Sequence, residues 1–303
     1  MDEVKANSLF EKVILPLRDD EYLDGDGLPR CKSCHTLRVY VSDDKTFCAR
    51  CLCKCQSEQI EKEKELEAIR RNLEEFYDRQ RLSLMGDRYK DCRLSTAVIT
   101  EHNRAAYARA KRYVEYAADM RRENIGLYFY GDNSSGKTYI TACICNELLR
   151  KGYRCVYTNF ARILSEIRSG YSGDGMGELD IMRKLMTCDF AFLDDFGKEF
   201  IGREYNRSAA KWAEEKLFEM INVRYNSKRP TVFSSNYAMD ELASKLSLDK
   251  AIIERVNEMS TRVIRLEGDD FRAKQLSCQN DKAIKYGIKP CFSASKNRDG
   301  NVV

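Results

Sequence analysis

The spacing of hydrophobic and polar positions divides the chain into a weakly patterned start, a charged stretch and a longer alternating part. Residues 1 to about 30 show no clear period. From Asp87 onward, short apolar runs typical of buried strands alternate with segments whose apolar positions recur every three or four residues, which is typical of helices. Alternating strands and helices favour a parallel sheet with helices on both faces, so we predict an α/β domain over residues 87–275.

The pattern also gives approximate bounds for the elements of this domain. Strands are expected at 126–130, 154–158, 190–193 and 231–234. Helices are expected at about 102–122, 139–150, 161–169 and 208–225, with a further helix ahead of residue 190. A loop rich in glycine and serine is expected at 169–177, and residues 276–303 are polar enough to predict a flexible tail.

Residues 57–86 are expected to form a charged helical linker. Eight acidic and five basic residues lie between Ser57 and Gln80, and several opposite charges stand four residues apart, which supports a helix. A narrow apolar stripe follows the same period and consists of Leu66, Ile69, Leu73 and Phe76. Two interpretations stay open, a solvated linker or a short seam that binds a partner or forms a coiled coil.

Composition and charge exclude some classes of protein. With 43% hydrophobic and 33% charged residues, the chain has the make-up of a globular protein, and its net charge of +4 does not by itself indicate a nucleic-acid partner. There is no apolar run of about 18 residues, so no membrane span is expected. The N-terminus lacks the basic-then-apolar pattern of a secretion signal, so we expect a cytoplasmic location.

Six of the thirteen cysteines lie between residues 31 and 55. Two C-x-x-C pairs, Cys31/Cys34 and Cys48/Cys51, are thirteen residues apart, a spacing that predicts a tetrahedral zinc site. Four thiolates would close the coordination shell and make the site structural rather than catalytic. Residues 1–56 are therefore expected to form a zinc-binding module.

Other ligand sets and other chemistries remain open for this cysteine-rich stretch. Cys53 and Cys55 offer further ligand pairs, and His35 could compete, although its position next to Cys34 is sterically awkward. An iron–sulfur cluster or a redox-active pair is the alternative to zinc. The odd number of cysteines and the lack of a secretion signal argue against a disulfide framework.

The strongest chemical signal is an eight-residue run that reads G-x-x-x-x-G-K-T. It consists of Gly131, Asp132, Asn133, Ser134, Ser135, Gly136, Lys137 and Thr138. A strand is expected before it and a helix after it, which is the context in which backbone N–H groups bind phosphates at the positive end of a helix. Lys137 would contact the β- and γ-phosphates of ATP, and the Thr138 hydroxyl would be a ligand of Mg²⁺. The alternative is a loop of small residues that matches the motif by chance, but such a loop would not be expected to lie between a strand and a helix.

Hydrolysis requires further groups, and three segments supply candidates. Asp194 and Asp195 end an apolar strand, where the first would support Mg²⁺ and the second would orient the attacking water. The alternative for this pair is a turn or a helix cap. Asn236, at the end of another strand, could hold that water, although asparagine often simply starts a turn. Arg255 could stabilise charge on the transferring phosphate from a neighbouring subunit, and by itself is indistinguishable from a surface arginine.

Together these segments resemble the helicase loaders of bacteria and phages, the DnaC/DnaI type within the AAA+ ATPases, whose close relatives are the IstB-type helper ATPases. The resemblance covers about residues 87–272 and is carried by Leu193–Gly197, Trp212–Tyr225, Pro230–Tyr237 and Glu254–Arg272. It implies that Asn236 is the sensor residue, Arg255 the arginine finger and Arg272 a γ-phosphate-sensing residue. The helical lid usual in AAA+ proteins is expected to be minimal.

The resemblance also implies a function. It implies ATP hydrolysis with Mg²⁺, loading of a replicative helicase onto single-stranded DNA, a zinc-bearing module that grips the helicase, and a homo-oligomer in which each finger completes a neighbour's site. The DNA candidates are Asn159–Arg168 and the region from Lys198 to Arg207. Two alternatives stay open: a transposase helper of the IstB type acting on duplex DNA, and a nucleotide-dependent scaffold without significant turnover. Intact Asp194 and Asp195 argue against the scaffold.

Overall fold

The computed structural model describes residues 17–42, 48–171, 177–197, 207–246 and 249–267. The chain divides into two compact units, Met1–Glu74 and Glu75–Val303, which are described separately below. The expected tail at 276–303 and the DNA candidates at 198–206 lie outside the described residues.

The first unit contains two short hairpins. Strand β1 (Glu21–Leu23) pairs antiparallel with β2 (Pro29–Cys31), and β3 (Val39–Val41) pairs antiparallel with β4 (Cys48–Arg50). The buried carboxylate of Glu21 joins the hairpins by accepting hydrogen bonds from Arg38 Nε (3.0 Å) and Arg50 Nη1 (2.7 Å). Burial alone would raise the pKa of Glu21, but these bonds and one from the Arg18 backbone lower it to about 2. A unit this small buries little apolar surface, so polar contacts such as these contribute much of its stability.

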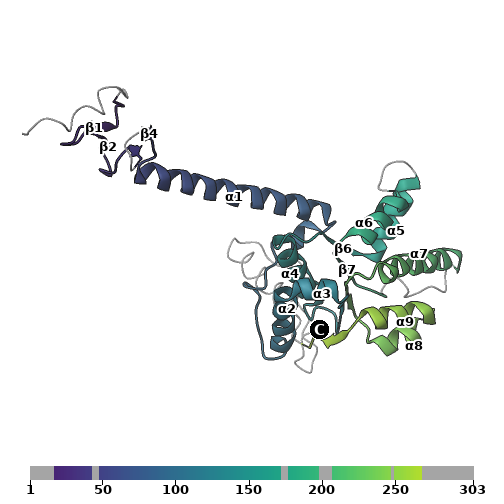
Figure 1. Cartoon of the computed structure of the whole chain (residues 1–303). Coiled ribbons are helices and arrows are strands. Elements are labelled where there is room, and N and C mark those ends of the chain that lie inside the picture. The colour runs from purple at the N-terminus through teal and green to yellow at the C-terminus, as the bar shows by residue number, and fades with distance from the viewer. Residues whose placement is uncertain (1–16, 43–47, 172–176, 198–206, 247–248, 268–303) are drawn as a thin grey trace, which may run out of the picture. The chain divides into compact units, whose positions relative to one another are not determined.

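The charged stretch forms one helix, α1 (Lys54–Leu82) (Figure 1). Its interior has neither glycine nor proline, and opposite charges pair along its surface, as between Arg79 and Glu75 at 3.2 Å. Leu66, Ile69 and Leu73 of the predicted stripe are all exposed. Phe76 is buried within the second unit, where the Arg150 guanidinium lies 4.7 Å from its ring centroid.

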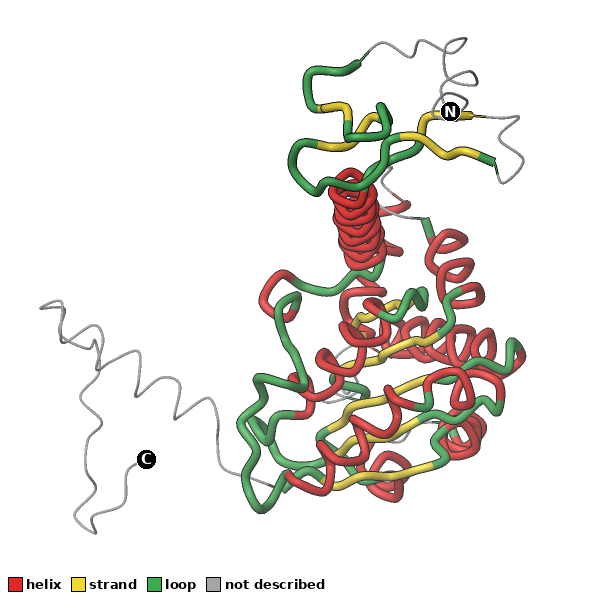
Figure 2. Tube along the Cα trace, turned by 60° about the vertical axis from the view of Figure 1, so that its left-hand side comes forward, coloured by secondary structure: helices red, strands yellow, loops and turns green. Residues whose placement is uncertain are grey.

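The second unit is built on a five-stranded sheet in the order β6-β7-β8-β5-β9, in which every neighbouring pair is parallel. The strands are β5 (Leu127–Tyr130), β6 (Cys155–Asn159), β7 (Phe190–Asp194), β8 (Thr231–Ser235) and β9 (Arg262–Arg265). Strand β8 therefore separates β5 from β7. Because neighbouring strands are parallel, their carboxyl ends lie at one edge of the sheet, and the loops that follow β5, β7 and β8 are brought together there. Figure 2 shows the strands of this sheet as yellow segments side by side, with red helices around them.

Side chains alternate between the two faces of this sheet, and each face has its own core. Along β5, Leu127 and Phe129 pack on one face and Tyr128 on the other. The first face is covered by α2 (Arg104–Glu115), α3 (Ala117–Arg122) and α4 (Lys137–Arg150). The second is covered by α5 (Phe160–Tyr171), α6 (Glu178–Thr187), α7 (Arg207–Asn226), α8 (Met239–Leu246) and α9 (Lys250–Met259). The predicted α/β architecture, a parallel sheet between two helical layers, is confirmed.

The predicted list of elements ended at the strand 231–234, and the structure adds the helix α9 and the edge strand β9 after it. The other differences are in boundaries and short pieces. The helix expected at 102–122 is broken at Tyr116 into α2 and α3. The short 3₁₀ helix η1 (Asp87–Tyr89), the two hairpins and α8 have too few residues to show a period in the sequence. No helix among the described residues is both long enough and apolar enough to cross a membrane.

Candidate functional site

The glycine-rich loop lies between β5 and α4, as its sequence predicts. Gly136 immediately precedes the helix and has φ 93°, a left-handed conformation that favours glycine. At Gly131 a Cβ atom would lie 2.1 Å from the Leu266 carbonyl oxygen, so only glycine fits beside the chain that leaves β9. The first backbone N–H groups of α4 are thereby directed into the loop, where a helix provides partial positive charge.

Lys137 is buried and its amine is held inside the loop. Its Nζ donates to the carbonyl oxygens of Gly131 (2.9 Å) and Asp132 (2.7 Å). These bonds place the positively charged amine of Lys137 next to Gly131 and Asp132, the first two residues of the loop. A cation held at a glycine-rich loop, together with the N–H groups at the start of a helix, is a setting that binds a phosphate group.

Asp194 is the last residue of β7 and lies against the start of α4. Its Oδ1 accepts a hydrogen bond from the Thr138 hydroxyl at 3.2 Å and another from the Ser234 hydroxyl. Burial raises the pKa of Asp194, while the bonds from Ser234 and Thr138 counteract that rise. Ser234 also accepts from the backbone N–H of Asp195 at 3.3 Å, so a residue that sequence analysis missed contacts both the Asp194 carboxylate and the main chain of Asp195.

Asp195 and Asn236 line the same cavity as the loop, and Asp195 is held with φ 53°. This conformation is uncommon for a residue with a side chain and turns the chain sharply after β7. The neighbouring Ser235 hydroxyl donates to the Phe196 carbonyl at 2.6 Å and accepts from the Tyr237 N–H, which ties the two loops together. The structure thus brings the candidate residues of three separate strands to one place.

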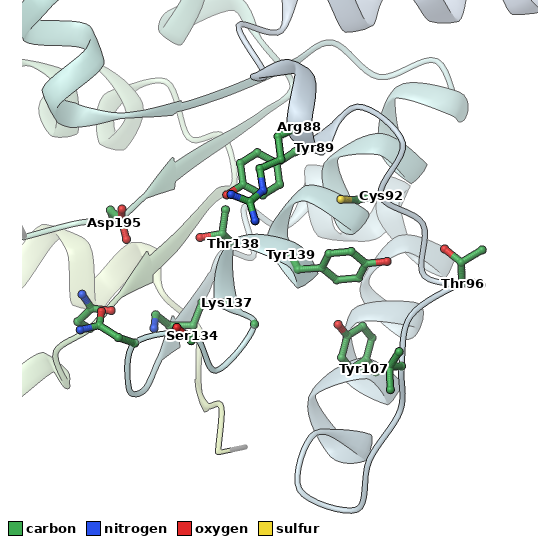
Figure 3. A pocket seen from close by; sticks show the side chains of 14 residues that line it. Arg88, Tyr89, Cys92, Thr96, Tyr107, Ser134, Lys137, Thr138, Tyr139 and Asp195 are labelled. Carbon is green, nitrogen blue, oxygen red and sulfur yellow. The ribbon is translucent and has the colours of Figure 1, made fainter. Parts of the chain in front are cut away.

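The cavity measures about 380 Å³ and has a second wall that sequence analysis did not identify. In Figure 3, Thr96, Tyr107 and Tyr139 lie together on the side of the cavity away from Asp195. The second wall comes from the segment after α1 and from α2, and its members are Arg88, Tyr89, Cys92, Thr96, Val98 and Tyr107. No motif marks these residues, because they meet the loop only through the packing of α2 and η1 on α4.

Arg255 is not among the described residues that line this cavity. Its guanidinium carbon lies 4.8 Å from the ring centroid of Phe218 and 5.7 Å from that of Tyr225, and its Nη1 donates to the Ala251 carbonyl. Arg255 therefore packs between α9 and α7, and any action on a phosphate would have to be on a neighbouring subunit. Arg272, the expected γ-phosphate-sensing residue, lies outside the described residues.

The described DNA candidates on α5 already have partners within the chain. Arg162 donates to the Leu84 carbonyl at 2.8 Å, and the Arg168 guanidinium lies 4.8 Å from the ring centroid of Trp212. Both side chains are exposed, so these contacts leave part of each guanidinium open to solvent.

A cysteine cluster lies in the first unit. The four Sγ atoms of Cys31, Cys34, Cys53 and Cys55 all lie within 4.8 Å of one another. Two of the separations are 3.6 Å, between Cys31 and Cys55, and 3.1 Å, between Cys53 and Cys55. Four sulfurs around zinc would be about 3.8 Å apart, as follows from a Zn–S distance of about 2.3 Å in a tetrahedron. The donor set and spacing therefore fit zinc.

Among the described side chains, the cluster includes Cys53 and Cys55 and leaves out Cys51 of the predicted second pair. Cys51 is exposed, its N–H donates to the Arg38 carbonyl, and its sulfur lies 3.5 Å from the Leu37 carbonyl, so it is directed away from the cluster. Cys53 is buried in its place and accepts from Arg38 Nη1 at 3.1 Å. The side chain of Cys48 lies outside the described residues.

The magnesium ligands suggested by the sequence also fit the geometry. The Thr138 hydroxyl and the Asp194 carboxylate supply oxygen atoms 3.2 Å apart at the mouth of the phosphate loop. Such hard oxygen donors are those that Mg²⁺ prefers, together with phosphate oxygens of the nucleotide.

Comparison with known proteins agrees with this site. A family model described as "IstB-like ATP binding protein" matches residues 101–279. The chain is 24% identical over 169 residues to the replicative helicase loader DnaC of Escherichia coli K12, a match that covers 56% of this chain and 64% of DnaC. It is 27% identical over 158 residues to the replicative helicase loader DnaI of Bacillus subtilis 168, covering 48% and 47%. The matched region thus spans about half to two thirds of these relatives.

Among solved structures, a crystal structure of DnaI aligns with a TM-score of 0.49 and 23% identity over 62% of this chain and 94% of that one. A crystal structure of the DnaC helicase loader aligns with a TM-score of 0.49 and 19% identity over 60% and 100%.

The strand order, the phosphate loop and the acidic strand end define a P-loop ATP-binding protein of the AAA+ class. Because the family model covers more than half of the chain, the protein belongs to the IstB-like ATP-binding family and is homologous to the DnaC/DnaI helicase loaders.

Proposed function

We propose that the protein is an ATP-dependent loader that places a replicative helicase on single-stranded DNA. The observation that carries the proposal is that Lys137 and Thr138 line one cavity with Asp195, in a chain homologous to two replicative helicase loaders. The buried Asp194 carboxylate lies directly beside this cavity, where it accepts a hydrogen bond from the Thr138 hydroxyl. Such a role would be carried out in the cytoplasm.

Five residues in or beside the cavity have roles in the proposed hydrolysis. Lys137 and the N–H groups at the start of α4 bind the β- and γ-phosphates. Thr138 and Asp194 hold Mg²⁺, which neutralises phosphate charge when bound. Asp195 and Asn236, from adjacent loops, orient the attacking water toward the γ-phosphate.

Turnover depends on assembly in this proposal. Arg255 lies on α9, away from its own chain's cavity, so it would act as a finger in the site of a neighbouring copy. Hydrolysis would then be fast only in a homo-oligomer whose subunits are aligned by single-stranded DNA and helicase. The zinc-bearing first unit is proposed to bind the helicase.

The first test is ATPase activity with and without single-stranded DNA. We expect low basal turnover that rises with DNA, and loss of nucleotide binding in Lys137→Ala, because that change removes the buried cation from the loop. Full nucleotide affinity in Lys137→Ala would contradict the assignment of the loop. Zero turnover under both conditions would favour the scaffold alternative.

The second test separates a loader from a transposase helper of the IstB type. Purified replicative helicase is expected to be retained by the immobilised full-length chain and then transferred to single-stranded DNA in the presence of ATP. Stimulation by duplex DNA, together with no retention of helicase, would instead support the helper.

A further inference from the structure

Two buried amide side chains, Asn146 and Gln80, lie behind the second wall of the cavity. Asn146 is on α4, the helix that begins at the phosphate loop, and is fully buried. Its Nδ2 donates to the carbonyl oxygens of Tyr89 (2.8 Å) and Cys92 (3.0 Å). Both of these residues line the cavity.

Gln80, on the last turn of α1, completes the same network. Its Nε2 donates to the Lys90 carbonyl at 2.8 Å and to the Asn146 Oδ1 at 3.0 Å, and it is buried. A backbone carbonyl can only accept a hydrogen bond, so both side-chain amides direct their NH₂ groups toward the carbonyl oxygens. The oxygen of the Asn146 amide is then left to accept from the NH₂ group of Gln80. Every hydrogen bond in the network follows from this constraint.

The network holds a segment that has little regular structure of its own. Between α1 and α2 the described residues form only the one-turn helix η1, so the carbonyls of residues 89–92 cannot be satisfied by a long helix or a sheet. Three of these carbonyls accept hydrogen bonds from Asn146 and Gln80. The Tyr89 carbonyl also accepts one from the Cys92 N–H. The position of the wall is therefore set from behind by two side chains that do not line the cavity themselves.

We propose that Asn146 and Gln80 are positioning residues for nucleotide binding, and that they fix the Arg88–Cys92 wall against the helix that carries the phosphate loop. The inference rests on the proposed binding of ATP in this cavity. The coupling acts in both directions: if the hydrogen bonds of Asn146 and Gln80 strengthen nucleotide binding, bound nucleotide must stabilise those hydrogen bonds by the same free energy. The last turn of α1 is thus coupled to occupancy of the cavity.

The test compares Gln80→Leu with Arg79→Met in the full-length chain. Arg79 is the adjacent residue of α1 and donates to the Leu149 carbonyl of α4 at 3.0 Å, so it anchors the same helix end without touching the wall. The affinity of each variant for a fluorescent, non-hydrolysable ATP analogue is measured at fixed Mg²⁺. Gln80→Leu is expected to weaken binding about tenfold, which corresponds to about 1.4 kcal/mol, and Arg79→Met by less than about twofold.

The results distinguish failure of the inference from failure of the proposed function. If wild-type protein does not bind the analogue, ATP binding in the cavity is refuted. If wild-type protein binds but Gln80→Leu binds equally well, or Arg79→Met is weakened to the same extent, the positioning role is refuted.

A second measurement does not depend on the variants folding. Hydrogen exchange of the wild-type amides in residues 75–92 is recorded with and without the analogue. Slower exchange in the presence of the analogue is expected from the coupling, and unchanged exchange across the segment at saturating analogue would overturn it.

Discussion

Ser234 offers a direct test of how the buried carboxylate at the site is stabilised. Its hydroxyl donates to Asp194 Oδ1 and accepts from the Asp195 N–H, and both Ser234 and Asp194 are buried. Replacement by alanine removes the donor without creating a clash. The change leaves a buried, charged carboxylate with one hydrogen bond fewer.

The expected cost follows from the charge of the acceptor. A hydrogen bond to an ionised group contributes about 1.5–3 kcal/mol to stability, compared with about 1 kcal/mol for a neutral pair. For a unit of this size, each kcal/mol lowers the melting temperature by about 2–4 °C, so Ser234→Ala is expected to lower it by about 3–12 °C. In an Asp194→Asn background, where the acceptor is neutral, the same change should cost only about 1 kcal/mol.

Thermal and urea unfolding of the four proteins of this double-mutant cycle, without nucleotide at neutral pH, measures the difference. Ser235→Ala is a matched control, because Ser235 is buried on the same strand but bonds the Phe196 carbonyl and the Tyr237 N–H instead. The control should cost the same in both backgrounds. An equal cost of Ser234→Ala in both backgrounds would refute the conclusion that an ionised Asp194 is what this bond stabilises.

Three further predictions concern charge, metal and assembly. Burial raises the pKa of Asp194 above its ordinary 3.8, so ionisation of this carboxyl destabilises the folded protein as pH rises above that value. Asp194→Asn should therefore raise the melting temperature of the nucleotide-free protein at neutral pH. This gain in melting temperature should vanish below about pH 4, where the carboxyl is protonated in both states. Cys53→Ser should lose bound zinc while Cys51→Ser keeps one equivalent, measured by metal analysis of purified protein; zinc loss in both variants would contradict the cluster. Arg255→Ala should retain ATP affinity but lose DNA-stimulated turnover, and unchanged turnover in an ATPase assay would exclude the finger role.

Much of the second unit could be predicted from local sequence patterns. The G-x-x-x-x-G-K-T run needs only eight consecutive residues to specify a glycine-containing turn into a helix, and Gly136 has the left-handed conformation that such a turn requires. The apolar run before Asp194 likewise predicts a buried strand with a carboxylate at its end. These features are local, because strand and helix periods arise from neighbouring residues on one element.

The cysteine cluster shows where local spacing is insufficient. The C-x-x-C spacing favours Cys48 and Cys51, but Cys51 is directed to the Leu37 carbonyl, and the chain turns so that Cys53 and Cys55 face Cys31 and Cys34. The backbone N–H of Cys51 bonds the carbonyl of Arg38, and sequence spacing does not contain that contact.

The sequence by itself determined the class of fold, the phosphate loop and the acidic strand end. Each of these depends on patterns formed by residues that are close together in the chain. Tertiary structure alone decided that Ser234 reaches Asp194, that the Arg88–Cys92 wall faces the loop, and that Asn146 holds that wall in place. These contacts join residues 40 to 57 positions apart in the chain. They exist because β8 lies beside β7 and because α4 packs against the segment before α2, and packing of that kind depends on the whole core rather than on any one period.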